Sequence, residues 1–511
     1  MAPTGRPAYT GIPADGGFWR GPGAPKRAAS TAIGVAVCFA TGLTSSHAEP
    51  FRVEPRASVG TAFTDNARLT PTNEQSDIYA TATVGAAASA SGGRVALDFD
   101  AEISYDKYST ESDIDGYRGQ LLGSMDTELI EDMFFVDVRA SIAERNVSIG
   151  SFSPATERSV NNGDRTRVYT GLINPYLKND LSGWAESTVS ATISRTEYDR
   201  TDVGGVSTTP DAATDFTGSV ALDSGRRFEV LQWGLLGRVD EELDGPTDTG
   251  QRTVQGSVAY VINRFWAVQA RAGYDDVDQA PGVTEDRSGA YYQGGLRLTP
   301  GPRTYFSFFV GRRYNSLSAE ANGWYEVTPT SRISVRYTDA VVTQSRAIAT
   351  SLSGIQPNDE GTFTDPVGVP VGLDGQDPNS VTDLGIVSGS FQQRSLQLGY
   401  AGEWLSVSGV YETRDLGVPG IPEEQVAAIS VGAFEDLSPR LKVRAGVGYR
   451  TVLQGRTLAE ENDLYTASAE AVYLLGDGLS VTGQVVRRAQ KQGTGIEVAE
   501  NVVGLALTKR W

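Results

Sequence analysis

The most constraining feature of this sequence is an alternation of apolar and polar residues in segments of about ten residues, which recurs from residue 51 to the C-terminus. The clearest segment is residues 95–108, where Asp98, Asp100 and Glu102 stand between apolar residues. Because successive strand residues point to opposite faces, this segment has one apolar and one acidic face. No stretch after residue 48 is apolar for long enough to cross a bilayer as a helix, so a membrane location requires strands.

The connections between these segments follow a second regularity. Short turns such as residues 91–93 and 476–478 alternate with longer polar connections such as residues 146–165 and 455–462. Many apolar faces begin or end in Tyr, Trp or Phe, as the aromatic girdles of a membrane protein require. The sequence therefore predicts an all-β protein: a single closed antiparallel transmembrane β-barrel of about 22 strands (range about 18 to 22), with short periplasmic turns, long extracellular loops and no plug domain.

The N-terminus has the layout of an export signal. Lys26 and Arg27 precede an apolar run over residues 28–43, and small residues follow up to Ala48. We expect residues 1–48 to be an N-terminal extension with a cleaved signal peptide, and residues 49–511 to be a barrel in the outer membrane of a Gram-negative cell. The expected partners are outer-membrane lipid and the barrel assembly machinery. The terminal Trp511 resembles the C-terminal signal that this machinery recognises, although Lys509 departs from the usual pattern.

Cleavage after Ala48 would remove Cys38 and His47, the only Cys and His of the chain. The mature protein would then have no thiol nucleophile, imidazole base or Cys/His metal site. We therefore expect no enzyme, no catalytic residues, no cofactor and no metal. The net charge of −19 argues against a nucleic-acid partner. Acidic clusters at residues 113–116 and 275–278 lack the full spacing of a calcium loop, and we interpret them as solvated loops.

Alternation also predicts which charged residues face the lumen. Opposed acidic and basic arcs would create a transverse field that selects polar solutes. The simpler interpretation is that charges are tolerated beside water and pair by sign with their strand neighbours. The candidate pore-lining residues are Asp98, Asp100, Glu102, Asp126, Glu128, Asp137, Arg139, Arg238, Asp240, Arg271, Arg297, Arg336 and Arg444.

One long connection could fill part of the lumen. Residues 342–390 are rich in Gly, Pro and Asp, which is typical of a solvated extracellular loop. An inward-folded gate is the alternative, because a barrel of this size encloses more space than its own side chains fill.

Several turn and strand segments resemble the PEP-CTERM-system-associated outer-membrane proteins, a family among the β-barrel porins. The resemblance implies a barrel linked to exopolysaccharide production and export, with exopolysaccharide or its export machinery as partner, and names no substrate. The segments that carry it are residues 63–66, 128–137, 174–177, 224–228, 233–235, 299–304 and 311–314.

Two functions follow from these observations. The first is a porin-like channel that passes polar solutes or assists export of exopolysaccharide. The second is a non-conducting barrel that anchors or organises an extracellular polymer through its loops. For the second, deletion of residues 354–378 would abolish polymer retention and leave conductance unchanged.

Overall fold

The computed structural model describes residues 51–149, 151–158, 165–199, 202–203, 206–207, 212–244, 249–278, 283–357, 362–373, 389–457 and 460–511. The expected export signal, residues 1–48, lies outside the described residues. Parts of the long connection at residues 342–390 lie outside them as well.

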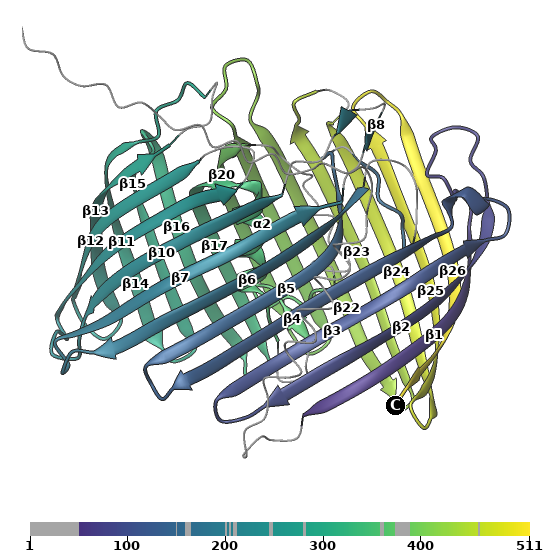
Figure 1. Cartoon of the computed structure of the whole chain (residues 1–511), viewed down its shortest axis with the longest axis horizontal. Coiled ribbons are helices and arrows are strands. Elements are labelled where there is room, and N and C mark those ends of the chain that lie inside the picture. The colour runs from purple at the N-terminus through teal and green to yellow at the C-terminus, as the bar shows by residue number, and fades with distance from the viewer. Residues whose placement is uncertain are drawn as a thin grey trace, which may run out of the picture. The chain divides into compact units, whose positions relative to one another are not determined.

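Long strands make up most of the described chain, as Figure 1 shows. In chain order they are β1 (Arg52–Thr64), β2 (Asp77–Ser91), β3 (Val95–Tyr108), β4 (Gly116–Ile130), β5 (Phe134–Asn146), β6 (Arg165–Asp180), β7 (Ala185–Tyr198), β10 (Ala213–Ser224), β11 (Leu231–Asp244), β12 (Gly250–Val261), β13 (Trp266–Val277), β14 (Gly289–Gly301), β15 (Thr304–Arg313), β16 (Ser316–Thr328), β17 (Ser331–Thr343), β20 (Ser390–Ala401), β21 (Leu405–Asp415), β22 (Glu424–Ser438), β23 (Leu441–Gln454), β24 (Asn462–Gly476), β25 (Leu479–Gln492) and β26 (Glu497–Arg510). The shorter elements are η1 (Ser112–Ile114), α2 (Gln344–Gly354), β8 (Asp202–Val203), β9 (Val206–Ser207), β18 (Gln356–Pro357) and β19 (Phe363–Thr364).

The long strands form one closed sheet of 22 antiparallel strands. Each strand pairs with its neighbour in the chain, and β1 pairs with β26, from Arg56 opposite Arg510 to Thr64 opposite Val502. Closure removes both sheet edges, so every strand has a partner on each side. The closed antiparallel barrel and its strand number agree with the sequence prediction.

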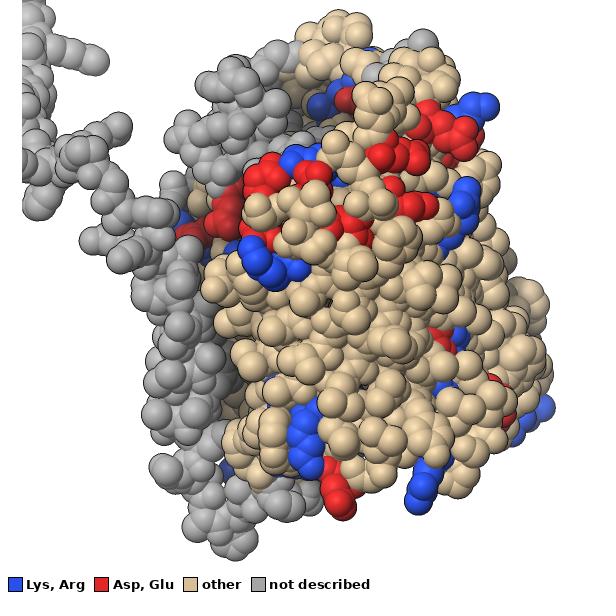
Figure 2. Space-filling view, turned by 90° about the vertical axis from the view of Figure 1, so that its right-hand side faces the viewer, with Lys and Arg blue, Asp and Glu red and all other residues tan. Residues whose placement is uncertain are grey.

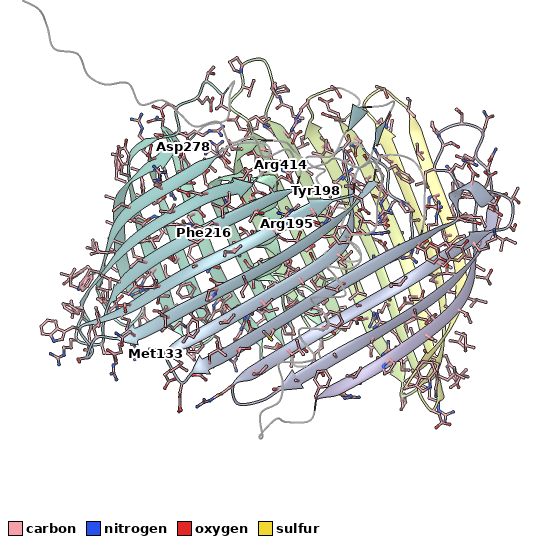
Figure 3. The ribbon with its side chains drawn as sticks, viewed as in Figure 1. Met133, Arg195, Tyr198, Phe216, Asp278 and Arg414 are labelled. Atoms are coloured by element: carbon pink, nitrogen blue, oxygen red, sulfur yellow. The ribbon has the colours of Figure 1, made fainter. Side chains whose placement is uncertain are left out.

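Short turns lie at one rim of the barrel and the longer connections mostly at the other. Figure 3 marks the two rims by Met133, in the turn between β4 and β5, and Asp278, which follows β13. Both β1 and β26 meet the short-turn rim, where the backbone N–H of Trp511 donates to Pro55 O at 3.1 Å. Lys509 also bonds within this rim, since its Nζ donates to the carbonyl oxygen of Asp477.

The outer face of the barrel is suited to lipid. Apolar side chains such as Ile103, Val503 and Leu505 are exposed in mid-strand, and Figure 2 shows an uncharged band with charged residues gathered above and below it. Exposed aromatic residues lie towards both strand ends, which places them at the two interfaces of a bilayer. They include Tyr117, Tyr274, Tyr292 and Tyr465 towards the long connections, and Trp184, Trp266, Tyr325 and Trp404 towards the short turns.

The expectation that nothing plugs the barrel is wrong. Residues 147–149 and 151–158, here called the lumenal loop, and residues 344–357 and 362–373, here called the helical insert, both fold inward. The insert begins with α2, which packs against β5, β6, β7, β10 and β17 and lies within the barrel in Figure 1. The physical reason is size, because wall side chains do not fill a 22-stranded barrel. The described part of residues 342–390 is therefore not a solvated loop.

The helical insert contains the one α-helix among the described residues. Within the described residues, no helix is long and apolar enough to cross a membrane.

Candidate functional site

The predicted acidic residues of β3 share the lumenal face of the barrel and are partly neutralised there. Arg56 of β1 reaches across β2, and its Nη2 lies 2.6 Å from Asp100 Oδ1 and 3.1 Å from Glu102 Oε2. Asp98 lies on the same face, two residues along the strand. The sequence analysis did not single out Arg56, because the pairing depends on which strands become neighbours.

A second acidic group lies on β4 and β5. Asp126 and Asp137 are direct cross-strand partners, and Arg139 Nη2 lies 2.8 Å from Asp126 Oδ1. Glu128, nearer the short turn, accepts a hydrogen bond from the backbone N–H of Asp132. These carboxylates thus extend the acidic wall of β3 around the barrel.

Several predicted basic residues lie on the lumenal face of the strands further round. Arg238 Nε lies 2.7 Å from Asp240 Oδ2, and Arg271 Nη2 lies 2.6 Å from Glu320 Oε2. Arg297 and Arg336 face the lumen on β14 and β17, and Arg444 does so on β23. Each of these two pairs matches opposite charges, within one strand for Arg238 and Asp240, and between the non-adjacent strands β13 and β16 for Arg271 and Glu320. The strands β4 and β17 stand on opposite sides of the ring, and the transverse field between such walls stays a prediction.

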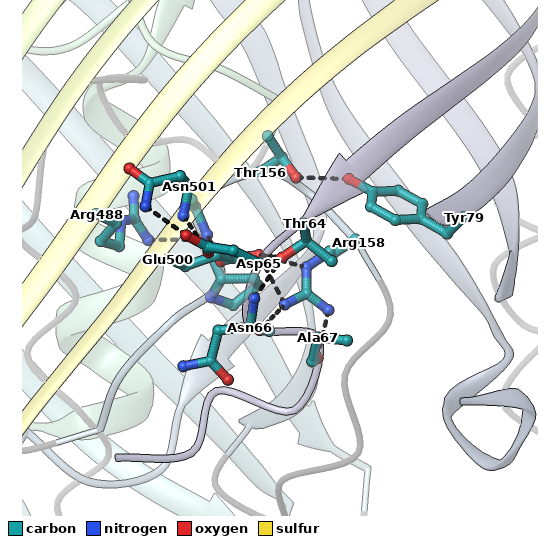
Figure 4. Close-up of polar contacts among 12 residues, drawn as sticks. Thr64, Asp65, Asn66, Ala67, Tyr79, Thr156, Arg158, Arg488, Glu500 and Asn501 are labelled. Atoms are coloured by element: carbon teal, nitrogen blue, oxygen red, sulfur yellow. Dashed lines mark hydrogen bonds and ion pairs between the residues drawn. The ribbon is translucent and has the colours of Figure 1, made fainter. Parts of the chain in front are cut away.

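The lumenal loop is held by a buried ion pair that sequence reasoning missed (Figure 4). Arg158 Nη2 lies 2.8 Å from Glu500 Oε1 of β26, and both side chains are completely buried. Arg158 also donates to Tyr108 Oη at 2.8 Å and to Ala67 O at 2.9 Å. Glu500 in addition accepts from the backbone N–H of Ala155 at 2.6 Å. Burial acts to lower the pKa of Arg158, but Glu500, Tyr108 and Tyr79 together raise it by more, so the pKa lies above its ordinary value and the charge is kept.

Arginines of the barrel wall also bind the backbone of this loop. Arg488 of β25 donates to Pro154 O at 2.8 Å, and Arg450 of β23 donates to Ile149 O at 3.2 Å. The Ile149 side chain packs with Val426 and Val452. The loop thus leaves β5 and fastens to β22, β23, β25 and β26 inside the barrel.

The helical insert is attached by both charge and apolar packing. Arg346 Nη2 lies 3.4 Å from Asp215 Oδ1 of β10, and both side chains are buried. Leu352 of α2 belongs to a buried cluster with Leu122 of β4 and Leu172 of β6. These lumenal leucines are unusual on a hydrated wall, and the alternation of their strands marks them as inward-facing.

A cavity of about 1760 Å³ lies inside the barrel between these elements. Its wall comes mainly from β1, β2, β4 and β21–β26, and both the lumenal loop and the helical insert contribute to it. Of the predicted pore-lining residues, Arg444 lines this cavity. The lining also includes residues that the sequence analysis did not select, although alternation within their strands would have placed many of them inward: Arg118, Gln120, Glu144, Arg165, Arg450, Glu470, Gln484 and Arg488.

Several carboxylates of the two acidic clusters are paired with cations of the protein. Arg68 Nη2 lies 2.5 Å from Asp113 Oδ1, and Lys107 Nζ lies 2.5 Å from Asp115 Oδ2. These hydrogen bonds lower the pKa of both carboxyl groups below their ordinary value. Asp275 is held by Arg313, whose Nε lies 2.7 Å from its Oδ2. Within the described residues, no group of three or more His, Cys, Asp or Glu side chains could hold a metal ion.

Comparison with known proteins gave similarity to solved structures alone. No protein-family model matches the sequence, and no curated protein matches it. The FrpB iron transporter from Neisseria meningitidis is 11% identical, with a TM-score of 0.46 over 91% of this chain and 83% of that one. The ferric-catecholate import receptor Fiu from E. coli K12 is 9% identical, with a TM-score of 0.44 over 91% and 82%. The ferric enterobactin receptor PfeA from Pseudomonas aeruginosa is 10% identical, with a TM-score of 0.43 over 90% and 80%.

Identities of 9–11% with TM-scores below 0.5 assign no solute to this chain.

Proposed function

We propose that this protein is an outer-membrane β-barrel transport protein whose lumen passes polar solutes under the control of the lumenal loop and the helical insert. The observation that carries the proposal is the cavity of about 1760 Å³ inside a barrel with an apolar outer belt. Membrane barrels with a polar interior conduct solutes or bind them on the way.

The lining of the cavity suits polar solutes that carry charge of either sign. Arg118, Arg444 and Arg488 line it together with Glu144 and Glu470. Many neutral donors and acceptors stand between these charges, including Gln120, Gln484 and several Ser and Thr side chains. A solute could therefore exchange its water for hydrogen bonds to the wall as it enters.

Control of passage follows from where the two inward segments are attached. Glu500 and Asp215 both lie towards the long-connection ends of their strands, whereas the cavity reaches Gly402 and Trp404 at a short turn. The segments thus enter from one rim while the cavity extends to the other. We infer that passage requires movement of at least one segment.

Planar-bilayer recording tests the proposal. The wild-type barrel is expected to show small, infrequent conductance steps, and replacing residues 354–378 by a short Gly-Ser linker is expected to raise the mean conductance several-fold. Heat-modifiable mobility on gels verifies that the deleted variant is still a folded barrel. A folded deletion variant that conducts no better than wild type would refute the channel and favour a non-conducting, polymer-anchoring barrel.

The choice of exopolysaccharide as solute rests on the family resemblance alone. It is tested by deleting the gene in the native host and measuring polysaccharide on the cell surface and in the medium. Export through this barrel predicts that polymer is lost from both, whereas anchoring predicts that polymer moves from the surface to the medium.

A further inference from the structure

We propose that the lumenal wall of β14–β17 and β20 holds a binding site for an anionic oxygen group, such as a phosphate, sulfate or carboxylate, on the transported solute. The inference deepens the proposed function and rests on it for the claim that the bound solute is transported. The site consists of one row of cross-strand partners, here called the arginine row: Arg297, Ser307, Asn322, Arg336 and Gln397.

The arginine row crosses five adjacent strands at right angles to them. Arg297 is opposite Ser307, which is opposite Asn322, and Asn322 is opposite Arg336. Direct cross-strand partners point to the same face of a sheet. Strand spacing places the Cα atoms of Arg297 and Arg336 about 14 Å apart. On a concave wall, two such long side chains can reach a common space between them.

The face that carries the row is the lumenal one. Gly399 lies on β20 two residues after Gln397, so both share a face. A Cβ atom on Gly399 would lie 2.8 Å from Val367 of the helical insert, which is inside the barrel. Asn322 is nevertheless exposed, so the row borders open space that water and solutes can occupy.

The charges of the row are not neutralised within the described part of the chain. Arg297 Nη2 donates to Gln232 Oε1 at 2.7 Å, a neutral partner, and no described carboxylate contacts Arg336. The two carboxylates nearest on β16 are engaged elsewhere. Glu320 lies 2.6 Å from Arg271, and Glu326 lies 2.9 Å from Arg332.

The row thus differs from the other lumenal arginines, many of which contact a carboxylate. Arg56, Arg238 and Arg313 are examples. Two guanidinium groups without an acid partner, separated by hydroxyl and amide side chains, present hydrogen-bond donors of the kind that oxygen anions prefer. The chemistry therefore selects an anionic group over a cationic or an apolar one.

Calorimetry on the detergent-solubilised full chain tests the site without requiring conductance. Inorganic phosphate, sulfate and acetate are titrated into wild type, into the double variant Arg297→Gln with Arg336→Gln, and into the control Arg312→Gln. Arg312 is exposed, and its partners Tyr292 and Leu317 place it on the outer face of β15. We expect at least about tenfold weaker anion binding by the double variant, because each lost charge-assisted hydrogen bond contributes about that factor. The control should bind as wild type does.

The outcomes separate this inference from the proposed function. Absence of anion binding by wild type, or equal binding by wild type and a heat-modifiable, folded double variant, would overturn the site. In bilayers under a KCl gradient, the double variant should shift the reversal potential towards cation selectivity, and a conducting variant with an unchanged potential would also count against the site. Anion binding that depends on the arginine row in a barrel that does not conduct would support the site and refute transport.

Discussion

At the scale of single residues, the Arg158–Glu500 pair decides whether the lumenal loop stays in place. Both side chains are removed from water, and Ala155 and Arg158 of the lumenal loop converge with Thr64 of β1 on the carboxylate of Glu500. Removing one member of a buried ion pair costs about 3–5 kcal/mol, because the other charge is left without compensation.

Glu500→Gln should release the lumenal loop. The lost charge leaves Arg158 buried without a counter-ion, and a cost of about 3–5 kcal/mol shifts the attached-to-released equilibrium by at least about a hundredfold. Mean conductance and the rate of proteolysis within residues 147–158 should both rise. Arg487→Gln is the control, because Arg487 is an exposed residue of the neighbouring strand β25. Identical proteolysis of Glu500→Gln and wild type would show that the ion pair is not the attachment.

At the scale of elements, α2 is held inside the barrel by apolar contact with the wall. The helix begins after Thr343, whose side chain accepts from the backbone N–H of Arg346, as an N-cap does. Its Leu352 is buried against Leu122 and Leu172. An isolated helix of 11 residues is marginal in water, so packing against the wall rather than helix propensity stabilises it.

Leu352→Asp should detach α2 from the wall, because a buried carboxylate without a partner is strongly unfavourable. An Ala349→Cys background reports the change, since Ala349 lies in the same buried cluster. Maleimide labelling of that thiol should be slow alone and at least about tenfold faster with Leu352→Asp, as burial and local opening control thiol access. Ser353→Asp, at an exposed position of α2, should leave labelling slow. Equal labelling rates with and without Leu352→Asp would contradict the packing argument.

At the scale of the whole molecule, the barrel separates a lipid face from a lumenal face within each strand. Val503 of β26 is exposed on the outer face and pairs with Val485 and Phe63. Gln484, which precedes Val485 on β25, lines the lumenal cavity instead. Neighbouring residues of one strand therefore face two different environments, the lipid outside the barrel and the hydrated lumen inside it.

Arginine substitution at the two faces should lower the free energy of unfolding by unequal amounts. Val503→Arg places a charge near mid-membrane and should lower the free energy of unfolding by about 2–4 kcal/mol. Gln484→Arg should change it little, because the lumen is hydrated. Urea unfolding of the protein reconstituted into vesicles measures both. Similar losses for the two variants would mean that the barrel does not sit in lipid as its outer belt indicates.

The sequence by itself determined the strands, their number to within a few, and the face on which residues such as Asp98 and Leu505 lie. These properties depend on a period of two residues, which is local along the chain. The sequence also indicated that the volume of the lumen would exceed the volume that the wall side chains fill. It left open whether residues 342–390 fold inward, and it led to the incorrect expectation of a barrel without a plug.

Only the tertiary structure decided what occupies the lumen and which charges meet. Arg56 reaches Asp100 across an intervening strand, and Ala155 and Arg158 meet Glu500 from more than 300 residues away in the chain. Such contacts arise because closure of the ring brings the last strands beside the first and sets every connection against a distant wall. Local periodicity carries no information about distances across the lumen, so the cavity and its two inward segments followed from closure and packing alone.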